Sequence, residues 1–244
     1  MAIDDRLLRI LRAFNERGPS SVISLAGQTG MSRPAVYRIL NTLVKGGYVR
    51  RKPSGALYEV TELVLTLSAG YRQQSWISNA GAKAMEQLQD RVRWPTTLTT
   101  HERGHMIVRE TTRFRSPLVF DLATIGMQIP MFRTAMGLVF YAHCDPEVQA
   151  IIRKFASQED LRCVPTDAQI AAIHQRGYAM RFGGVQPTTS TIALPLLSRS
   201  GPVGAICVTY AKSALSAEQA ATEFVPQLRA AALDIIHAYE QAAI

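Results

Sequence analysis

The sequence predicts a two-domain α+β protein, in which a small helical domain is joined by a helical linker to a larger α/β domain. The chain has 244 residues, enough for two modest domains. Residues 1–61 carry ten Lys/Arg against four Asp/Glu, whereas residues 62–244 carry seventeen against fifteen. Helical periodicity fills the first part, while β-rich stretches alternate with helices in the second. We therefore expect domains at 1–61 and 76–244, with a linker helix over 62–75.

Composition excludes several classes of protein. No apolar stretch approaches the roughly 18 residues that a membrane helix needs. Charged Asp4, Asp5 and Arg6 stand where a secretory signal would be apolar. The three cysteines are widely spaced, with no CxxC pair. We expect a cytoplasmic protein with no membrane partner, no metal and no cofactor.

Three helices follow from apolar spacing and from residues that start and stop helices. Between residues 4 and 16, apolar side chains recur at helical spacing, namely Leu7, Leu8, Leu11 and Phe14. Gly18 and Pro19 end this helix. A second helix begins after Ser21 and ends at Gly30. Ser32 is expected to cap a third helix, with Pro34 in its first turn, where the missing N–H costs nothing.

The third helix and the hairpin after it predict a DNA-binding surface. One arc of this helix is apolar, with Val36, Ile39, Leu40 and Leu43, so the opposite arc faces outward. A strand from residue 48 then reaches a basic triplet, turns at 53–55 and returns over 57–60. Basic and amide side chains on such elements contact bases and phosphates. The expected DNA-contact residues are Ser32, Arg33, Pro34, Tyr37, Arg38, Asn41, Lys45, Arg50, Arg51 and Lys52. The alternative is a DNA-silent helical interaction module, for which basic helix and basic hairpin would coincide by chance.

The second domain is expected to contain an antiparallel sheet covered by helices. The expected strands are Thr96–His101, His105–Thr112, Tyr178–Gly183, Thr191–Leu197 and Val203–Tyr210. The expected helices are 76–93, Thr134–His143, Asp145–Ala156, Thr166–Arg176 and Ala217–Gln241. On the last strand, Ile206, Val208 and Tyr210 share a packing face, and Ala205, Cys207 and Thr209 share the other, which we assign to a pocket wall.

Residues 25–49, LAGQTGMSRPAVYRILNTLVKGGYV, resemble the winged helix of the IclR family of regulators. Ala35 stands where that family commonly has Thr or Ser. The resemblance continues through GMQIP (126–130), TAMGL (134–138), RGY (176–178) and IALP (192–195), and so covers essentially the whole chain. Leu138 and Val139 replace the usual Lys-Ala. Segments 94–98, 108–118 and 137–144 are most similar to the branch that activates aromatic-acid catabolic operons.

The resemblance implies that the second domain is a GAF-like effector-binding domain. It also implies that the protein forms a homodimer or homotetramer, which binds double-stranded operator DNA and has RNA polymerase as a further partner. It also implies that Thr134, Ala135 and Met136 bind the carboxylate of a small aromatic effector. Free N–H groups at a helix start suit that role. Cys207, Thr209 and the loop around Gln186 would line the pocket. Arg109 and Arg133 are candidates for clamping the carboxylate, or equally for surface ion pairs. A repressor of the same architecture that senses a different metabolite is the open alternative.

Residues 101–105 read HERGH, a formal match to the zinc-peptidase motif HExxH. That chemistry needs both histidines on one helix face. Here both flanks are β-type and Arg103-Gly104 favours a hairpin turn, so a zinc hydrolase is the remote alternative. We find no catalytic residues and expect no enzyme.

Overall fold

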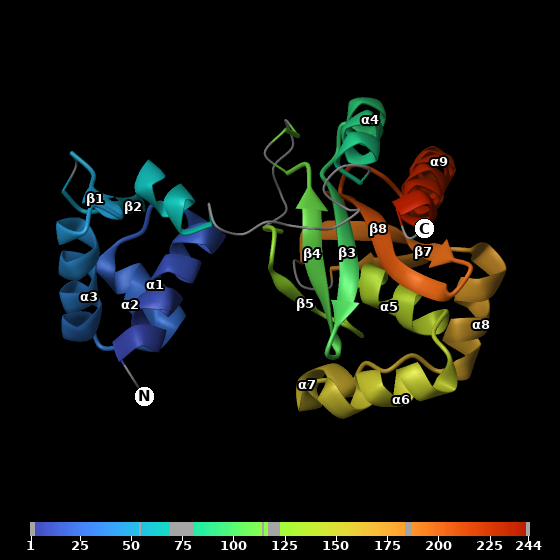
Figure 1. Cartoon of the computed structure of the whole chain (residues 1–244), viewed down its shortest axis with the longest axis horizontal. Coiled ribbons are helices and arrows are strands. Elements are labelled where there is room, and N and C mark those ends of the chain that lie inside the picture. Colours follow the sequence, from blue (N-terminus) through green and yellow to red (C-terminus); the bar gives the residue numbers. More distant parts are fainter. Residues whose placement is uncertain are drawn as a thin grey trace. The chain divides into compact units, whose positions relative to one another are not determined.

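The computed structural model describes residues 3–53, 55–68, 81–113, 115–116, 123–183 and 187–242 (Figure 1). They form two compact units, the N-terminal unit up to Gln73 and the C-terminal unit from Gln74. Each unit has its own hydrophobic core, so each is described by itself.

The N-terminal unit is a three-helix bundle with a hairpin. It consists of α1 (Ile3–Arg17), α2 (Val22–Thr29), α3 (Arg33–Lys45), β1 (Val49–Arg51) and β2 (Tyr58–Val60). The two strands pair antiparallel, and Ser20 bridges to Tyr58 at the edge of the pair. The expected arrangement is therefore confirmed, with one correction on α1. Ile10 is fully buried while Leu8 is 51% exposed, so the apolar stripe is rotated relative to the one predicted.

The helix boundaries follow the predicted signals with one exception. Ser21 Oγ accepts a hydrogen bond from Ser24 N–H at 3.2 Å, and Gly30 ends α2 at φ 66°. Ser32 occupies the N-cap position of α3, but its side chain makes no capping hydrogen bond. An N-cap side chain accepts from the second or third helical N–H, and Pro34 has removed one of these two donors.

The predicted linker helix is a 3₁₀ helix where the structure describes it. Residues Glu62–Ser68 form a 3₁₀ helix, η1, and residues 69–75 lie outside the described residues. Thr66 Oγ1 donates to the Leu63 carbonyl at 2.6 Å, and Ser68 Oγ donates to the Leu65 carbonyl at 2.9 Å. These hydroxyls bond carbonyls three residues back, which favours the tighter helix over the α pattern.

The C-terminal unit is built on a six-stranded sheet in the order β5-β4-β3-β8-β7-β6, with every neighbouring pair antiparallel. The strands are β3 (Thr96–Glu102), β4 (His105–Thr111), β5 (Gln128–Pro130), β6 (Ala179–Phe182), β7 (Thr189–Ser198) and β8 (Gly201–Ala211). This confirms the expected sheet. The short edge strand β5 was not expected from the sequence.

Helices cover both faces of the sheet (Figure 1). Helices α4 (Ala82–Val92) and α9 (Ala217–Ala242) cover one face, where Leu98, Ile206 and Tyr210 are buried. Helix α5 (Ala135–Ala142) packs on the other face, and Ala205 and Cys207 belong to its core. The same layer contains α6 (Pro146–Phe155), α7 (Gln158–Leu161) and α8 (Asp167–Arg176). The alternation predicted for β8 is confirmed.

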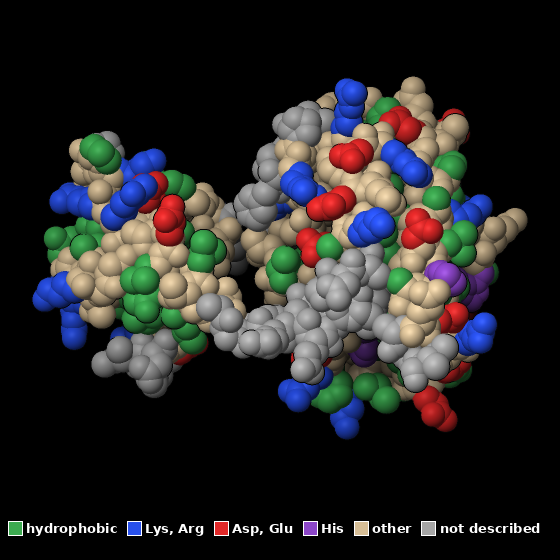
Figure 2. All heavy atoms as spheres, turned by 45° about the horizontal axis from the view of Figure 1, so that its top comes forward, with side chains coloured by type: hydrophobic (Ala, Val, Ile, Leu, Met, Phe, Trp, Pro, Cys, Tyr) green, Lys and Arg blue, Asp and Glu red, His purple; other side chains and the backbone are tan. Residues whose placement is uncertain are grey.

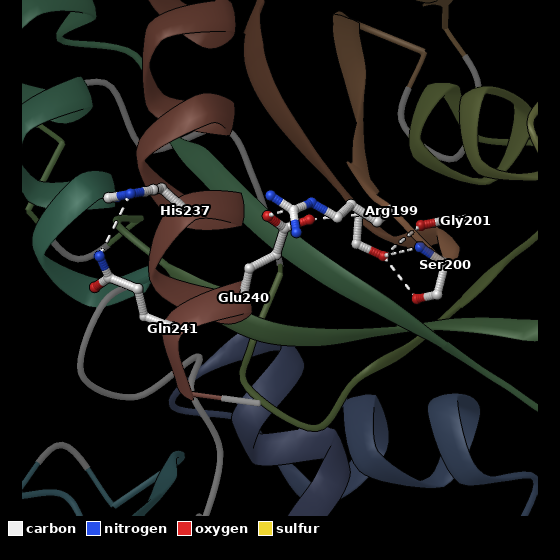
Figure 3. Close-up of polar contacts among 7 residues, drawn as sticks. Arg199, Ser200, Gly201, His237, Glu240 and Gln241 are labelled. Atoms are coloured by element: carbon white, nitrogen blue, oxygen red, sulfur yellow. Dashed lines mark hydrogen bonds and ion pairs between the residues drawn. The ribbon is translucent and has the colours of Figure 1, made fainter. Parts of the chain in front are cut away.

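The C-terminal end of α9 is bonded to the β7–β8 turn (Figure 3). Glu240 accepts a hydrogen bond from Arg199 N–H at 3.1 Å, and its other oxygen lies 3.7 Å from Arg199 Nε. Helix α9 thus follows its face of the sheet to the end of the longest strand pair. Among the described residues, no helix combines the length and apolarity needed to traverse a bilayer.

Candidate nucleic-acid interface and effector site

The outer face of α3 presents the residues expected to contact DNA. Val36, Leu40 and Leu43 are buried against α1 and α2, so the opposite face is open. Ser32, Arg33, Pro34, Tyr37, Arg38, Asn41 and Lys45 are all exposed. Blue Lys and Arg side chains gather on the N-terminal unit in Figure 2, whereas blue and red alternate over the C-terminal unit. The structure thus places a cationic helix face where a duplex groove could receive it.

The hairpin cations are less free than the sequence indicated. Glu59 on β2 lies 2.7 Å from Arg50 Nε and 3.3 Å from Lys52 Nζ. The hydrogen bond from Arg50, with Lys52 beside it, lowers the pKa of Glu59. Arg51 donates to the Gly55 carbonyl at 2.6 Å, and its guanidinium lies 5.9 Å from the Tyr58 ring centre. One acidic side chain therefore offsets part of the positive charge of the hairpin.

The start of α5 has the geometry of an anion site. Thr134 caps the helix, because its Oγ1 accepts from Gly137 N–H at 3.2 Å. The same hydroxyl donates to the Pro130 carbonyl at 2.9 Å. No acceptor for the N–H groups of Ala135 and Met136 is found in the described part of the chain. Two first-turn donors at the positive end of the helix dipole thus have no acceptor among the described residues.

The segment before α5 is held by a buried carboxylate that sequence analysis missed. Asp160, at 3% exposure, accepts hydrogen bonds from Met131 N–H at 2.9 Å and from Phe132 N–H at 3.0 Å. A Cβ on Gly137 would lie 1.9 Å from the Met131 carbonyl oxygen, so only glycine fits against this segment. These contacts fix the chain that leads into the start of α5.

Polar groups on the sheet face α5 across the predicted pocket wall. Thr97 pairs with Cys207, so both lie on the same side of the sheet. Thr97 is fully buried, and its hydroxyl has no hydrogen-bond partner among the described residues. Thr99 Oγ1 lies 3.7 Å from Met136 Sδ at the start of α5. Thr209 reaches Thr191 through their hydroxyls, 3.4 Å apart. Cys207 and Thr209 therefore lie on the face of the sheet that α5 covers, together with Thr97 and Thr99. Met136 of α5 lies against this face.

The two candidate arginines have different positions. Arg109 donates to Thr100 Oγ1 at 2.7 Å and pairs with Glu102 at 3.3 Å. Thr100 and Glu102 point to the face opposite Thr99, so Arg109 does not join the α5 site. Arg133 directly precedes Thr134, although it pairs with Glu159 at 2.6 Å. Gln186 lies outside the described residues.

The HERGH segment forms the predicted hairpin between β3 and β4. Arg103 and Gly104 have φ values of 46° and 85°, which is the geometry of a two-residue turn. His101 Nε2 accepts from Gly104 N–H at 3.2 Å, and its ring stacks on Phe140 of α5 at 5.2 Å. Burial lowers the pKa of His101. The two histidines are not one helical turn apart, so the geometry of a zinc peptidase does not form.

Comparisons with known proteins agree with both units. Residues 5–53 match the family model of the IclR helix-turn-helix domain, and residues 70–237 match that of the bacterial transcriptional regulator IclR C-terminal domain. The chain is 24% identical to the Pca regulon regulatory protein of Pseudomonas putida, over 95% of this chain and 82% of that protein. It is 23% identical to the transcriptional regulator KdgR of Escherichia coli K12, over 94% and 89%.

Solved structures share the fold. The IclR homologue of Microbacterium hydrocarbonoxydans, complexed with 4-hydroxybenzoate, superposes with a TM-score of 0.64 at 20% identity, over 98% of this chain and all of that one. IclR of Thermotoga maritima gives a TM-score of 0.64 at 17% identity, over 96% and 97%. The matching families and relatives are transcriptional regulators, not enzymes. With an N-terminal helix-turn-helix domain and a C-terminal ligand-binding domain, the chain belongs to the IclR family of DNA-binding transcriptional regulators.

Proposed function

We propose that this regulator activates an operon for aromatic-acid degradation when a small aromatic carboxylate binds at the start of α5. The observation that carries the proposal is the pair of uncommitted N–H groups of Ala135 and Met136, opposite the buried hydroxyl of Thr97. The carboxylate would accept from these N–H groups, and a ring hydroxyl would bond Thr97. Arg133, Cys207, Thr209 and Gln186 complete the proposed site, whereas Arg109, bonded to Thr100 and Glu102 on the opposite face of the sheet, is not part of it.

Two comparisons support the chemical class of the effector. A structure with the same fold is complexed with 4-hydroxybenzoate, and a relative is named for the Pca regulon. At 20% and 24% identity, these two proteins support the aromatic-acid class of the effector. We propose 3-(3-hydroxyphenyl)propionate, on the basis of the sequence likeness in segments 94–98, 108–118 and 137–144.

On DNA, α3 would enter the major groove and the hairpin would hold the adjacent backbone. Arg38 and Asn41 would reach base edges, while Arg50, Arg51 and Lys52 would contact phosphates. The protein would act in the cytoplasm as a homodimer or homotetramer and would recruit RNA polymerase. Effector binding would shift the population between two placements of the DNA-binding domains.

The test is a footprint on the DNA upstream of the gene, repeated with 3-(3-hydroxyphenyl)propionate and with its uncharged amide. Only the acid should alter protection or reporter expression, because the amide cannot place a carboxylate at α5. Arg38→Gln should weaken the footprint by about 1–3 kcal/mol, whereas Arg12→Gln, an exposed arginine on α1, should not. A fall in reporter expression on deleting the gene indicates an activator; a rise indicates the repressor alternative. An equal response to acid and amide would exclude the carboxylate site.

A further inference from the structure

A cavity lies in the N-terminal unit between α1 and α3. It has a volume of about 430 Å³. Arg6 and Leu7 line it from α1. The other wall consists of residues on one side of α3, namely Ala35, Arg38, Ile39, Asn41, Thr42 and Lys45. Its size is within the usual range of small-molecule sites, about 300–1,000 Å³.

The charges in this cavity are all positive. Arg6, Arg38 and Lys45 line it, and no aspartate or glutamate is among its described lining residues. Arg6 Nε is buried and has no hydrogen-bond partner in the described part of the chain. Buried donors are nearly always satisfied, so an unpaired guanidinium N–H in a cavity points to an acceptor that enters from outside. A carboxylate matches a guanidinium best, because both groups are planar and bidentate.

The remaining wall is apolar. Leu7, Ala35 and Ile39 offer carbon surface beside the cations. A backbone phosphate would fill only a fraction of this volume and would gain nothing from that surface, whereas an aromatic ring would bury apolar area there. We propose that this cavity is a second binding site, for a small amphiphilic anion of the aryl carboxylate class, with its carboxylate on Arg6 and its ring against Leu7 and Ile39.

Such a ligand would compete with DNA. Arg38, Asn41 and Lys45 line the cavity. They also belong to the DNA-contact face of the proposed function, and the predicted competition rests on that proposed function. A carboxylate seated between α1 and α3 neutralises cations that phosphates would otherwise use and crowds the face that enters the groove. Occupying the cavity would therefore release operator DNA independently of the C-terminal effector site.

The binding test uses the full-length protein with isoleucine δ1-methyl labels, titrated with benzoate and with benzamide. The Ile39 signal, assigned through Ile39→Leu, should shift saturably with benzoate and not with benzamide. Arg6→Gln should weaken this response about tenfold or more, because a charge-assisted hydrogen-bond pair is lost. Arg6→Lys should restore part of the affinity, and Arg12→Gln should leave it unchanged. Thermal melting of each variant checks that it is folded. An Ile39 signal that benzoate does not move would overturn the proposal.

The competition test measures DNA affinity with and without benzoate. On addition of benzoate, the wild-type protein should lose more DNA affinity than the Arg6→Gln variant does. An equal effect on both proteins would overturn the second site while leaving an effector response at α5 intact. A third outcome also overturns it. If Arg6→Gln weakens DNA binding and lowers the salt slope by about one while Ile39 ignores benzoate, Arg6 is a phosphate contact only.

Discussion

Asp160 is a buried side chain on which the geometry of the proposed effector site depends. Its two carboxylate oxygens accept from Met131 and Phe132, and these two N–H groups are buried with it. Glu159, its neighbour in sequence, is 72% exposed and pairs with Arg133 at the surface. Adjacent carboxylates thus have different physical roles, one that satisfies buried donors and one in a solvated ion pair.

Asp160→Ala should lower the free energy of unfolding by roughly 2–4 kcal/mol, because two buried N–H groups lose their acceptor. Glu159→Gln, the matched control, should change it by about 1 kcal/mol or less, since exposed ion pairs contribute little. Chemical denaturation of the two variants and the wild type measures both effects. Similar losses in the two variants would contradict the role given to Asp160.

Among the elements, the β1–β2 hairpin has its own counter-charge. Glu59 holds Arg50 and Lys52 within ion-pair distance, so both cations are partly neutralised before any DNA arrives. A hairpin whose cations were all free would bind any duplex more tightly. Under the proposed function, Glu59 would restrain the part of DNA binding that does not depend on base sequence.

Glu59→Gln should strengthen binding to non-cognate DNA and steepen its salt dependence by about one unit of slope, since a cation is freed for a phosphate. Arg50→Gln should have the opposite effect. Titration of a labelled random duplex at several salt concentrations measures both slopes. Glu62→Gln, the same charge change on η1, serves as control. The prediction fails if this control steepens the slope as much as Glu59→Gln does.

The C-terminal end of α5 is followed by a half-buried histidine, His143. His143 Nδ1–H donates a hydrogen bond to the Val139 carbonyl at 2.8 Å, and its ring lies 4.9 Å from that of His174. Burial lowers the pKa of His143, and His174 lowers it further, against the opposing effect of the Val139 carbonyl. The folded protein thus prefers the neutral imidazole, while the unfolded chain takes up a proton near the ordinary pKa of 6.5.

The unfolding free energy should therefore be highest above pH 6.5 and fall as the pH drops through this value, because the unfolded state then binds more protons. His143→Gln should make this decline shallower. Denaturation curves at a series of pH values from neutral to mildly acidic would measure the slope. His237→Gln, an exposed histidine on α9, is the control and should keep the wild-type slope. An unaltered slope in His143→Gln would remove His143 as the cause.

For the whole molecule, ligand binding and stability are linked. A carboxylate bound only by the folded protein stabilises it by about 2.7 kcal/mol at a hundred times its dissociation constant. For a domain of this size, that should raise the Tm by roughly 5–10 °C. Calorimetry with 3-(3-hydroxyphenyl)propionate and with its amide measures the difference. A melting curve that no aromatic acid shifts would count against the effector site at α5.

Patterns local in sequence predicted much of this molecule. The order of α1, α2 and α3, the basic hairpin and most strands of the sheet follow from apolar spacing and turn residues. The HERGH hairpin was also predictable, because Arg103-Gly104 sits between β-type flanks. The departures are local as well: Thr66 and Ser68 bond carbonyls three residues back within the 3₁₀ helix η1, and Pro34 removed a donor from the cap of α3.

What the sequence by itself determined is the kind of protein, a regulator with a cationic helix-turn-helix unit and an α/β unit whose strand faces alternate. Only the tertiary structure decided which side chains act together. Asp160 reaches donors 28 and 29 positions away, Thr97 shares the α5 face of the sheet with Cys207, and the buried Nε of Arg6 belongs to a cavity lined by α3. Periodicity reports which face of an element is buried, but hydrogen bonds and ion pairs between distant segments form only once the chain has folded, because their geometry depends on how the elements pack.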